Sequence, residues 1–295
     1  MTIDILSDIH IDFYFRDIPL SKYLFSFFEP ILTNNGRKNI SDMLIIAGDI
    51  GHHNKQNIEM LTLMKELFSY KYIVCVLGNH DYYLIHSNKK YSNNSLNRAE
   101  EMRALINEQD GMYCLDGNVI EIDGIRIGGC DSWYDGKYIK KHFHKNNNQH
   151  MDNYIDTLWN KTMADAEYIH GLNWKTYAEE ETEKLENIYK DVDIMVTHIN
   201  PSIEKVHTEE IYREGETTGF FTFDGEKFVQ NGTMQYWIYG HTHTKSEYTL
   251  HNVQCVCNPM GYPHESANGA VTEVRSIEIM SKKDMSKQII FQMGH

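Results

Sequence analysis

Five short apolar segments, each ending in polar residues, constrain the fold of this chain more than any other feature of its 295 residues. They are TIDILSD (2–8), MLIIAGD (43–49), YIVCVLGN (72–79), DIMVTH (193–198) and QYWIYGH (235–241). Uninterrupted Val, Ile and Leu residues over this length are typical of strands buried on both faces, as in a sheet that helices cover. The segments therefore predict an α/β fold with several central strands.

Helical periodicity separates the early segments. Residues 57–70 and 95–110 carry apolar residues at the spacing of one helix face. Strand and helix alternate over residues 1–80, which predicts βαβ units with parallel neighbouring strands. Asp116-Gly117 and Asp123-Gly124 predict hairpin turns. Late strands are predicted by three segments: VQCVC (253–257), SIEIM (276–280) and KQIIFQM (287–293).

The length of the chain fits one large domain or two small ones. We predict a single domain over residues 1–295, with a layered α/β/α or αββα arrangement. Residues 142–190 are polar and rich in helix-forming residues. We interpret residues 135–190 as an insertion near the functional site and a candidate lid.

The charge balance limits the partners of this chain. Acidic residues outnumber basic residues by 42 to 28, for a formal charge of -14. Such a surface repels a nucleic-acid backbone, so we expect no stable binding to duplex nucleic acid. A small phosphorylated substrate is compatible with this charge if metal ions supply a local positive field.

The sequence favours a cytoplasmic protein. No segment has the roughly 18 consecutive apolar residues that a membrane helix needs, so we expect no membrane partner. The first residues lack the basic and apolar regions of a signal peptide. The five cysteines are scattered and odd in number, which indicates reduced, buried thiols.

Residues with metal-binding side chains follow all five apolar segments. Functional groups in open α/β sheets gather beyond the carboxyl ends of the strands. Those ends here carry Asp8-Ile9-His10, Gly48-Asp49, Gly78-Asn79-His80-Asp81, Thr197-His198 and Gly240-His241-Thr242-His243. Residues two apart on an extended backbone share a face, and we expect the glycines to let the chain turn sharply.

Imidazole and carboxylate groups without thiolate indicate Mn, Fe or Zn. These side chains are too many for one tetrahedral ion, whereas two ions about 3.5–4 Å apart and bridged by a carboxylate would use them all. Any one of them alone could be a helix cap or a satisfied polar residue. The repetition of the same chemistry at five strand ends favours a shared metal site.

The order D-x-H, GD, GNHD, H, GHTH over residues 8–243 resembles the calcineurin-like metallophosphoesterase superfamily. Four further segments resemble small bacterial and phage-type members: GGCDSWYD (128–135), MDNYID (151–156), THINPSIEKVH (197–207) and CNPMGYPHE (257–265). The resemblance implies an αββα metallophosphoesterase sandwich with a mainly helical insertion. It also implies phosphoester hydrolysis with two divalent metal ions, of which Mn²⁺ is expected before Fe, Zn, Ni or Co.

The same resemblance assigns roles to individual residues. It implies a first metal ion held by Asp8, His10 and His243, and a second held by Asn79, His198 and His241, with Asp49 bridging the two. His80 would not bind metal but would protonate the leaving oxygen or stabilise the transition state. Asp81 would either orient His80 through its other ring N–H or cap a helix.

Substrate contacts are less constrained by the sequence. The protein-phosphatase branch of the superfamily has an arginine in GDxxDRG, and its absence from residues 48–53 argues against a protein serine/threonine phosphatase. The NPRGY-type arginine is replaced by Met260.

Two interpretations are open for His52 and His53. One of them contacts substrate or a metal-bound water, or they are surface histidines. His207 matches a histidine of the resembling segment and is a candidate substrate contact. Trp133 either stacks on a nucleobase or forms part of the core or pocket wall.

Three functions are compatible with these residues. The first is hydrolysis of a phosphoester, with a preference for phosphodiesters of small, nucleotide-like molecules. The second is a nuclease acting on nucleic-acid ends, which would need a basic groove, whereas the sequence offers only short basic clusters such as the lysine pairs 89–90 and 140–141. The third is a non-catalytic interaction module, which would be expected to have lost metal ligands that this chain retains.

Overall fold

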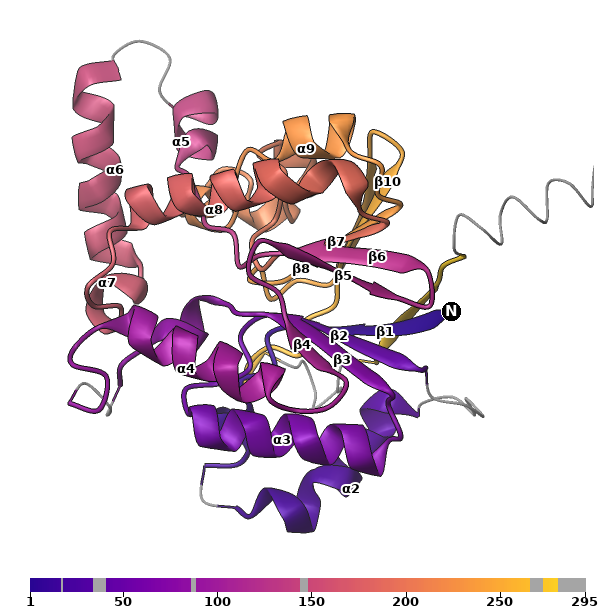
Figure 1. Cartoon of the computed structure of the whole chain (residues 1–295). Coiled ribbons are helices and arrows are strands. Elements are labelled where there is room, and N and C mark those ends of the chain that lie inside the picture. Colours follow the sequence, from indigo (N-terminus) through magenta and orange to yellow (C-terminus); the bar gives the residue numbers. More distant parts are fainter. Residues whose placement is uncertain (17, 34–40, 86–88, 144–147, 266–272, 281–295) are drawn as a thin grey trace, which may run out of the picture.

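The computed structural model describes residues 1–16, 18–33, 41–85, 89–143, 148–265 and 273–280. Two sheets packed face to face form its centre (Figure 1). Their strands are β1 (Thr2–Leu6), β2 (Met43–Ala47), β3 (Tyr72–Val76), β4 (Met112–Cys114), β5 (Asn118–Ile122), β6 (Ile125–Gly129), β7 (Ile194–Val196), β8 (Tyr236–Tyr239), β9 (Ser246–Leu250), β10 (Val253–Cys257) and β11 (Arg275–Glu278). All five apolar segments of the sequence form strands, as predicted.

The first sheet has the order β11-β1-β2-β3-β4. Strands β1 to β4 run parallel to their neighbours, with Ile5 opposite Ile45 and Ile45 opposite Val74, and β11 is antiparallel to β1. The predicted parallel βαβ units are therefore confirmed. The late strands expected over 253–257 and 276–280 are also confirmed, as β10 and β11. The strand expected over 287–293 lies outside the described residues.

The second sheet has the order β5-β6-β7-β8-β10-β9, with antiparallel strands at both edges. The hairpin predicted at Asp123-Gly124 is confirmed: it joins β5 to β6, with φ values of 51° and 78°. The hairpin predicted at Asp116-Gly117 is wrong. Strand β4 pairs with β3, whereas β5 pairs with β6, so this turn carries the chain from one sheet to the other.

The interface between the sheets is an apolar core. Alternate residues of each buried strand point into it, as the two-residue period of a strand requires. The first sheet contributes Ile3, Ile5, Met43, Ile45, Ala47, Val74 and Val76, and the second contributes Ile125, Ile127, Ile194, Val196, Ile238 and Val256. This core fixes the two sheets against each other and therefore fixes the loops at their ends.

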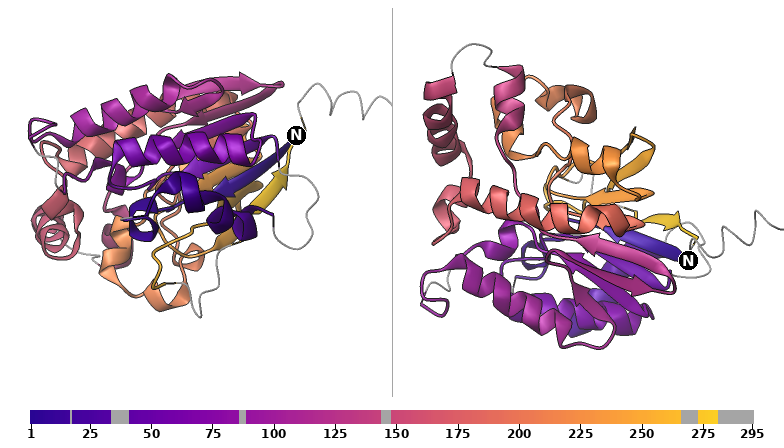
Figure 2. Two further views of the ribbon diagram at one scale, coloured as in Figure 1. Left: turned by 90° about the horizontal axis from the view of Figure 1, so that it is seen from below. Right: turned by 45° about the horizontal axis from the view of Figure 1, so that its top comes forward.

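Helices cover the outer faces of both sheets, which gives the expected αββα sandwich. The helices are α1 (Ile11–Tyr14), α2 (Leu20–Leu32), α3 (Asn54–Leu67), α4 (Ser95–Asn107), α5 (Lys137–His142), α6 (Asn148–Thr162), α7 (Asp165–Tyr168), α8 (Trp174–Ile188) and α9 (Glu226–Asn231). Helices α2, α3 and α4 lie on the first sheet, and α8 and α9 lie on the second (Figures 1 and 2). Both helices predicted between the early strands are confirmed as α3 and α4.

The segment 135–190 is mainly helical and contains α5 to α8. Helix α8 packs on the second sheet, while α5 and α6 project beyond the end of the sandwich (Figure 2). None of the described helices is both long and apolar enough to cross a lipid bilayer.

Candidate metal centre

The carboxyl ends of strands from both sheets meet at one edge of the sandwich and bring the expected metal ligands together. Asp8, His10, Asp49 and His243 form one group, and Asp49, His198 and His241 form a second. Within each group the candidate ligand atoms lie within 4.8 Å of one another. Because Asp49 belongs to both groups, the arrangement has the form of a site for two metal ions.

Asn79 lies beside the second group. Its Oδ1 is 3.2 Å from Nε2 of His198. Its Nδ2 donates a hydrogen bond of 2.7 Å to Oδ1 of Asp165, which fixes the orientation of the amide with its oxygen toward the site. All seven residues that the sequence indicated as ligands are therefore close together.

The backbone at these ligands adopts an uncommon conformation. Five of the seven have positive φ angles: Asp8 (51°), His10 (45°), Asp49 (55°), His241 (68°) and His243 (49°). Non-glycine residues rarely occupy the left-handed region, which costs about 1–3 kcal/mol at each position. The surrounding fold imposes this strain, and it turns each side chain toward the common centre.

Glycines next to the ligands provide space. A Cβ atom on Gly48 would lie 2.3 Å from Nδ1 of His198, and one on Gly78 would lie 2.2 Å from Oδ1 of Asp49. The sharp turn expected at these glycines occurs at Gly48, where φ is 86°, but Gly78 is extended and Gly240 does not have a left-handed φ. At Gly78 and Gly240, therefore, a sharp turn is not the reason for glycine. Close packing of the strand ends excludes a side chain there.

Each of three imidazoles is held through the ring nitrogen that faces away from the site. His198 donates from Nδ1 to the carbonyl of Ala47 at 2.8 Å, and His241 donates from Nε2 to the carbonyl of Phe220 at 3.0 Å. Nδ1 of His243 lies 2.6 Å from Oε2 of Glu265. A carbonyl can only accept, so the ring nitrogen on the opposite side of His198 and His241 is available to a metal ion.

One oxygen of the buried Asp49 carboxylate accepts no hydrogen bond from the described residues. The side chain is 1% exposed, and Oδ2 accepts no hydrogen bond from any described residue. This oxygen lies 3.7 Å from Nε2 of His10 and 3.5 Å from Nε2 of His198. A buried carboxylate oxygen without a hydrogen bond is costly, and a bridging cation pair would satisfy it. The donor set and this oxygen therefore fit two divalent cations.

The ionisable groups of the cluster shift one another's pKa values. Burial opposes ionisation of Asp49, but the neighbouring histidines His198 and His80 outweigh it and hold the pKa of this carboxyl well below its ordinary value. Burial likewise opposes protonation of His198, yet Asp49 and Asp8 raise its pKa to about 10. Without a metal ion, an imidazolium would therefore compensate the central carboxylate, and a bound cation would replace that proton.

His80 belongs to neither ligand group. Its Nδ1 lies 2.8 Å from Nε2 of His52, and Nδ1 of His52 lies 2.7 Å from Oδ2 of Asp12. The hydroxyl of Tyr262 is 3.1 Å from the other ring nitrogen, Nε2. His52 is buried, so its interpretation as a surface histidine is wrong, and it contacts the His80 ring instead of lining the cavity.

The expected hydrogen bond from His80 to Asp81 is also wrong. Asp81 is fully buried and accepts backbone N–H groups of Gly78 at 2.9 Å, Ile50 at 3.2 Å and Gly51 at 3.3 Å. It caps the short 3-10 helix Asn79–Tyr82, which was the alternative interpretation. His80 instead contacts His52, which in turn contacts Asp12. No motif in the sequence connected Asp12 with His80.

A cavity of about 430 Å³ opens beside the two ligand groups. His207 lies on its wall, where the ring stacks on Tyr248 with centroids 4.1 Å apart. Trp133 does not line this cavity: it is 2% exposed and packs edge-on against Tyr82 and Tyr177. Its role as a substrate contact is wrong, and the core alternative is correct.

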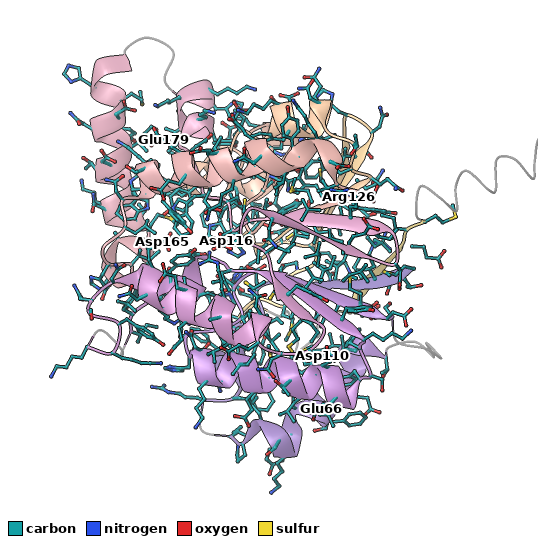
Figure 3. The ribbon with its side chains drawn as sticks, viewed as in Figure 1. Glu66, Asp110, Asp116, Arg126, Asp165 and Glu179 are labelled. Atoms are coloured by element: carbon teal, nitrogen blue, oxygen red, sulfur yellow. The ribbon has the colours of Figure 1, made fainter. Side chains whose placement is uncertain are left out.

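The helical segment contributes a wall of the cavity through Thr162, Met163, Ala164 and Asp165. Asp165, labelled in Figure 3, is fully buried and accepts hydrogen bonds from Asn79, from the hydroxyl of Tyr83 at 2.6 Å and from that of Tyr134 at 2.7 Å. The sequence gave no sign of this role, because Asp165 lies 86 positions from Asn79.

Comparisons with known proteins agree with this geometry. The family model described as calcineurin-like phosphoesterase matches residues 1–245. The chain is 26% identical over 245 residues to uncharacterized protein L509 of Acanthamoeba polyphaga mimivirus, which covers 79% of this chain and 83% of that protein. The crystal structure of the phosphopantetheinyl hydrolase PptH from Mycobacterium tuberculosis superposes with a TM-score of 0.60 at 16% identity. That superposition covers 94% of this chain and 95% of PptH, and it shows a shared fold.

Proposed function

The chain belongs to the calcineurin-like phosphoesterase family, and from this premise we propose that it hydrolyses a phosphodiester of a small, nucleotide-like molecule. The observation that carries the proposal is Oδ2 of Asp49, buried without a hydrogen-bond donor among the described residues at the point where the two ligand groups meet. A phosphodiesterase with two divalent ions uses a carboxylate in this position as the bridge.

In this proposal Asp8, His10 and His243 hold one ion, Asn79, His198 and His241 hold the other, and Asp49 is shared. Two such ions neutralise the phosphate oxygens and lower the pKa of a bound water. The set of imidazole, carboxylate and amide groups without thiolate supports Mn²⁺ as the first metal to test, with Fe, Zn, Ni and Co as alternatives.

His80 is the proposed acid for the leaving oxygen. The carboxylate of Asp12 accepts a hydrogen bond from Nδ1 of His52, which leaves Nε2 of His52 as an acceptor. His80 must then donate from Nδ1, and its Nε2 faces the hydroxyl of Tyr262 on the cavity side. Nε2 of the neutral ring therefore holds a lone pair toward the cavity, and His80 acts as the acid once this nitrogen has taken up a proton.

The remaining features support a single domain over residues 1–295 in which the end of α6 and the start of α7 form one side of the substrate cavity. Thr162 and Asp165 line that cavity directly. All five cysteines are free and buried, which supports a reducing cytoplasm as the compartment.

The proposal is tested by the hydrolysis of bis-p-nitrophenyl phosphate by the purified protein with added Mn²⁺. We expect release of p-nitrophenolate. With a phosphodiester whose leaving group is an alkoxide, which needs protonation, we expect His80→Ala to lower kcat by about 10²–10⁴-fold, as is typical for loss of a general acid. The metal content of His80→Ala should match the wild type. A matched control is His251→Ala, because His251 pairs with Glu226 on the surface. Inactivity with Mn, Fe, Co, Ni and Zn would contradict the proposed function.

A further inference from the structure

The described wall of the cavity beside the metal centre carries carboxylates but no permanently charged basic side chain. Among the described residues that line it there is no lysine or arginine. Four carboxylates line it: Asp49, Asp165, Glu209 and Glu265. Much of the remaining wall is made of tyrosine, phenylalanine and threonine side chains.

Three of these carboxylates interact closely with neighbouring side chains. Asp49 lies between the two ligand groups, Glu265 pairs with His243 at 2.6 Å, and Asp165 accepts hydrogen bonds from Asn79 and two tyrosines. These three carboxylates therefore belong to the metal centre or orient the residues that form it.

Glu209 differs from the other three. Its Oε2 accepts a hydrogen bond of 2.8 Å from the hydroxyl of Thr244, which is neutral, and it forms no ion pair with any described residue. His207 does not offset the charge, because burial lowers the pKa of its imidazole and leaves it neutral at pH 7. Glu209 thus places an unpaired negative charge on the wall of the cavity, beyond the metal ligands His241 and His243.

We propose that Glu209 sets the substrate class: the site accepts phosphodiesters in which the scissile phosphate carries the only negative charge. The inference rests on the proposed function, since the metal centre must hold that phosphate. An uncharged organic group would lie along the wall that includes Tyr212, Phe221 and Tyr239. A second phosphate on this group would meet Glu209 with no basic side chain of the described wall to compensate it, and like charges repel at this range.

The test compares two chromogenic esters that differ only in charge: the p-nitrophenyl ester of thymidine 5′-phosphate, and the same ester with a 3′-phosphate. We expect the wild type to hydrolyse the 3′-phosphorylated ester with a kcat/KM about tenfold lower, the size expected for repulsion at a partly hydrated site. Glu209→Gln should bring the two values together, because glutamine keeps an oxygen for the Thr244 hydrogen bond but loses the charge. Glu209→Lys should favour the 3′-phosphorylated ester.

Glu210→Gln is the matched control, because Glu210 is also exposed but does not line the cavity. Its ratio of the two kcat/KM values should equal that of the wild type. Equal hydrolysis of both esters by the wild type, or a ratio that neither Glu209 variant alters, would overturn the inference while leaving the phosphoesterase function intact. Failure to hydrolyse either ester or bis-p-nitrophenyl phosphate would overturn both.

Discussion

Asp12, His52 and His80 form a chain of side chains that begins at the partly exposed Asp12 and ends at the cavity. The two hydrogen bonds of the chain are 2.7 and 2.8 Å long and fix the tautomer of each ring. Tyr83 stacks on His80 with ring centroids 4.3 Å apart and limits its rotation. The position of the His80 proton therefore depends on residues that do not touch the substrate.

We expect His52→Ala to lower kcat by about 10–100-fold, the usual effect of losing a residue that orients a functional imidazole. KM and metal content should stay near those of the wild type, because His52 is not a candidate ligand. His52→Gln, which can still accept a hydrogen bond from His80, should recover part of the loss. The control is His53→Ala, an exposed neighbour. An unchanged kcat, or loss of bound metal, would show that His52 has another role.

Individual candidate ligands were recognisable from the sequence because each follows a strand that its apolar residues make recognisable. Asp8, Asp49 and His198 could therefore be named as candidates before their positions in space were known. Of the two roles left open for Asp81, orienting His80 is wrong and capping a helix is correct. The true chain joins residues from separate loops, 28 and 40 positions apart, and short-range patterns do not report such contacts.

At the scale of elements, helix α7 has a function beyond packing. It is only four residues long, Asp165–Tyr168, and its first residue holds the amide of Asn79. The helical segment and the short 3-10 helix Asn79–Tyr82 are thus coupled through one buried carboxylate. Rotation of the Asn79 amide would turn a nitrogen instead of an oxygen toward the proposed second ion.

We expect Asp165→Ala to reduce occupancy of the second metal ion, because the Asn79 amide would lose the acceptor that orients it. Elemental analysis after dialysis should find close to one tightly bound ion per chain. The hydroxyls of Tyr83 and Tyr134 would lose the acceptor for their own protons, which should also destabilise the fold by about 1–3 kcal/mol each. Tyr134→Phe is the control, since it removes one hydrogen bond to Asp165 and keeps that of Asn79. Two tightly bound ions in Asp165→Ala would contradict this role.

The strands themselves were predictable, because buried apolar segments bounded by polar residues allow few other structures. The pairing of β4 and β5 was not. Asp116-Gly117 has the composition of a hairpin turn, but Leu115 donates its N–H to Cys75 of the first sheet while Asn118 pairs with Gly129 of the second. Turn residues specify a local bend and do not determine which strand becomes the neighbour.

At the scale of the whole molecule, the apolar core between the two sheets determines where the residues of the metal centre lie. The core aligns the ends of β1, β2 and β3 with those of β7 and β8, and the candidate ligands follow those ends. The strained backbone at five ligands is tolerated because this core holds the strand ends in place. The sequence predicted this convergence correctly, since parallel strands end at a common edge.

The most direct test of the account is anomalous diffraction from crystals of the protein soaked in Mn²⁺. We predict two peaks on either side of the Asp49 carboxylate, about 3.5–4 Å apart. Asp8, His10 and His243 should surround one peak, and Asn79, His198 and His241 the other. A single peak, or manganese bound away from Asp49, would contradict the account.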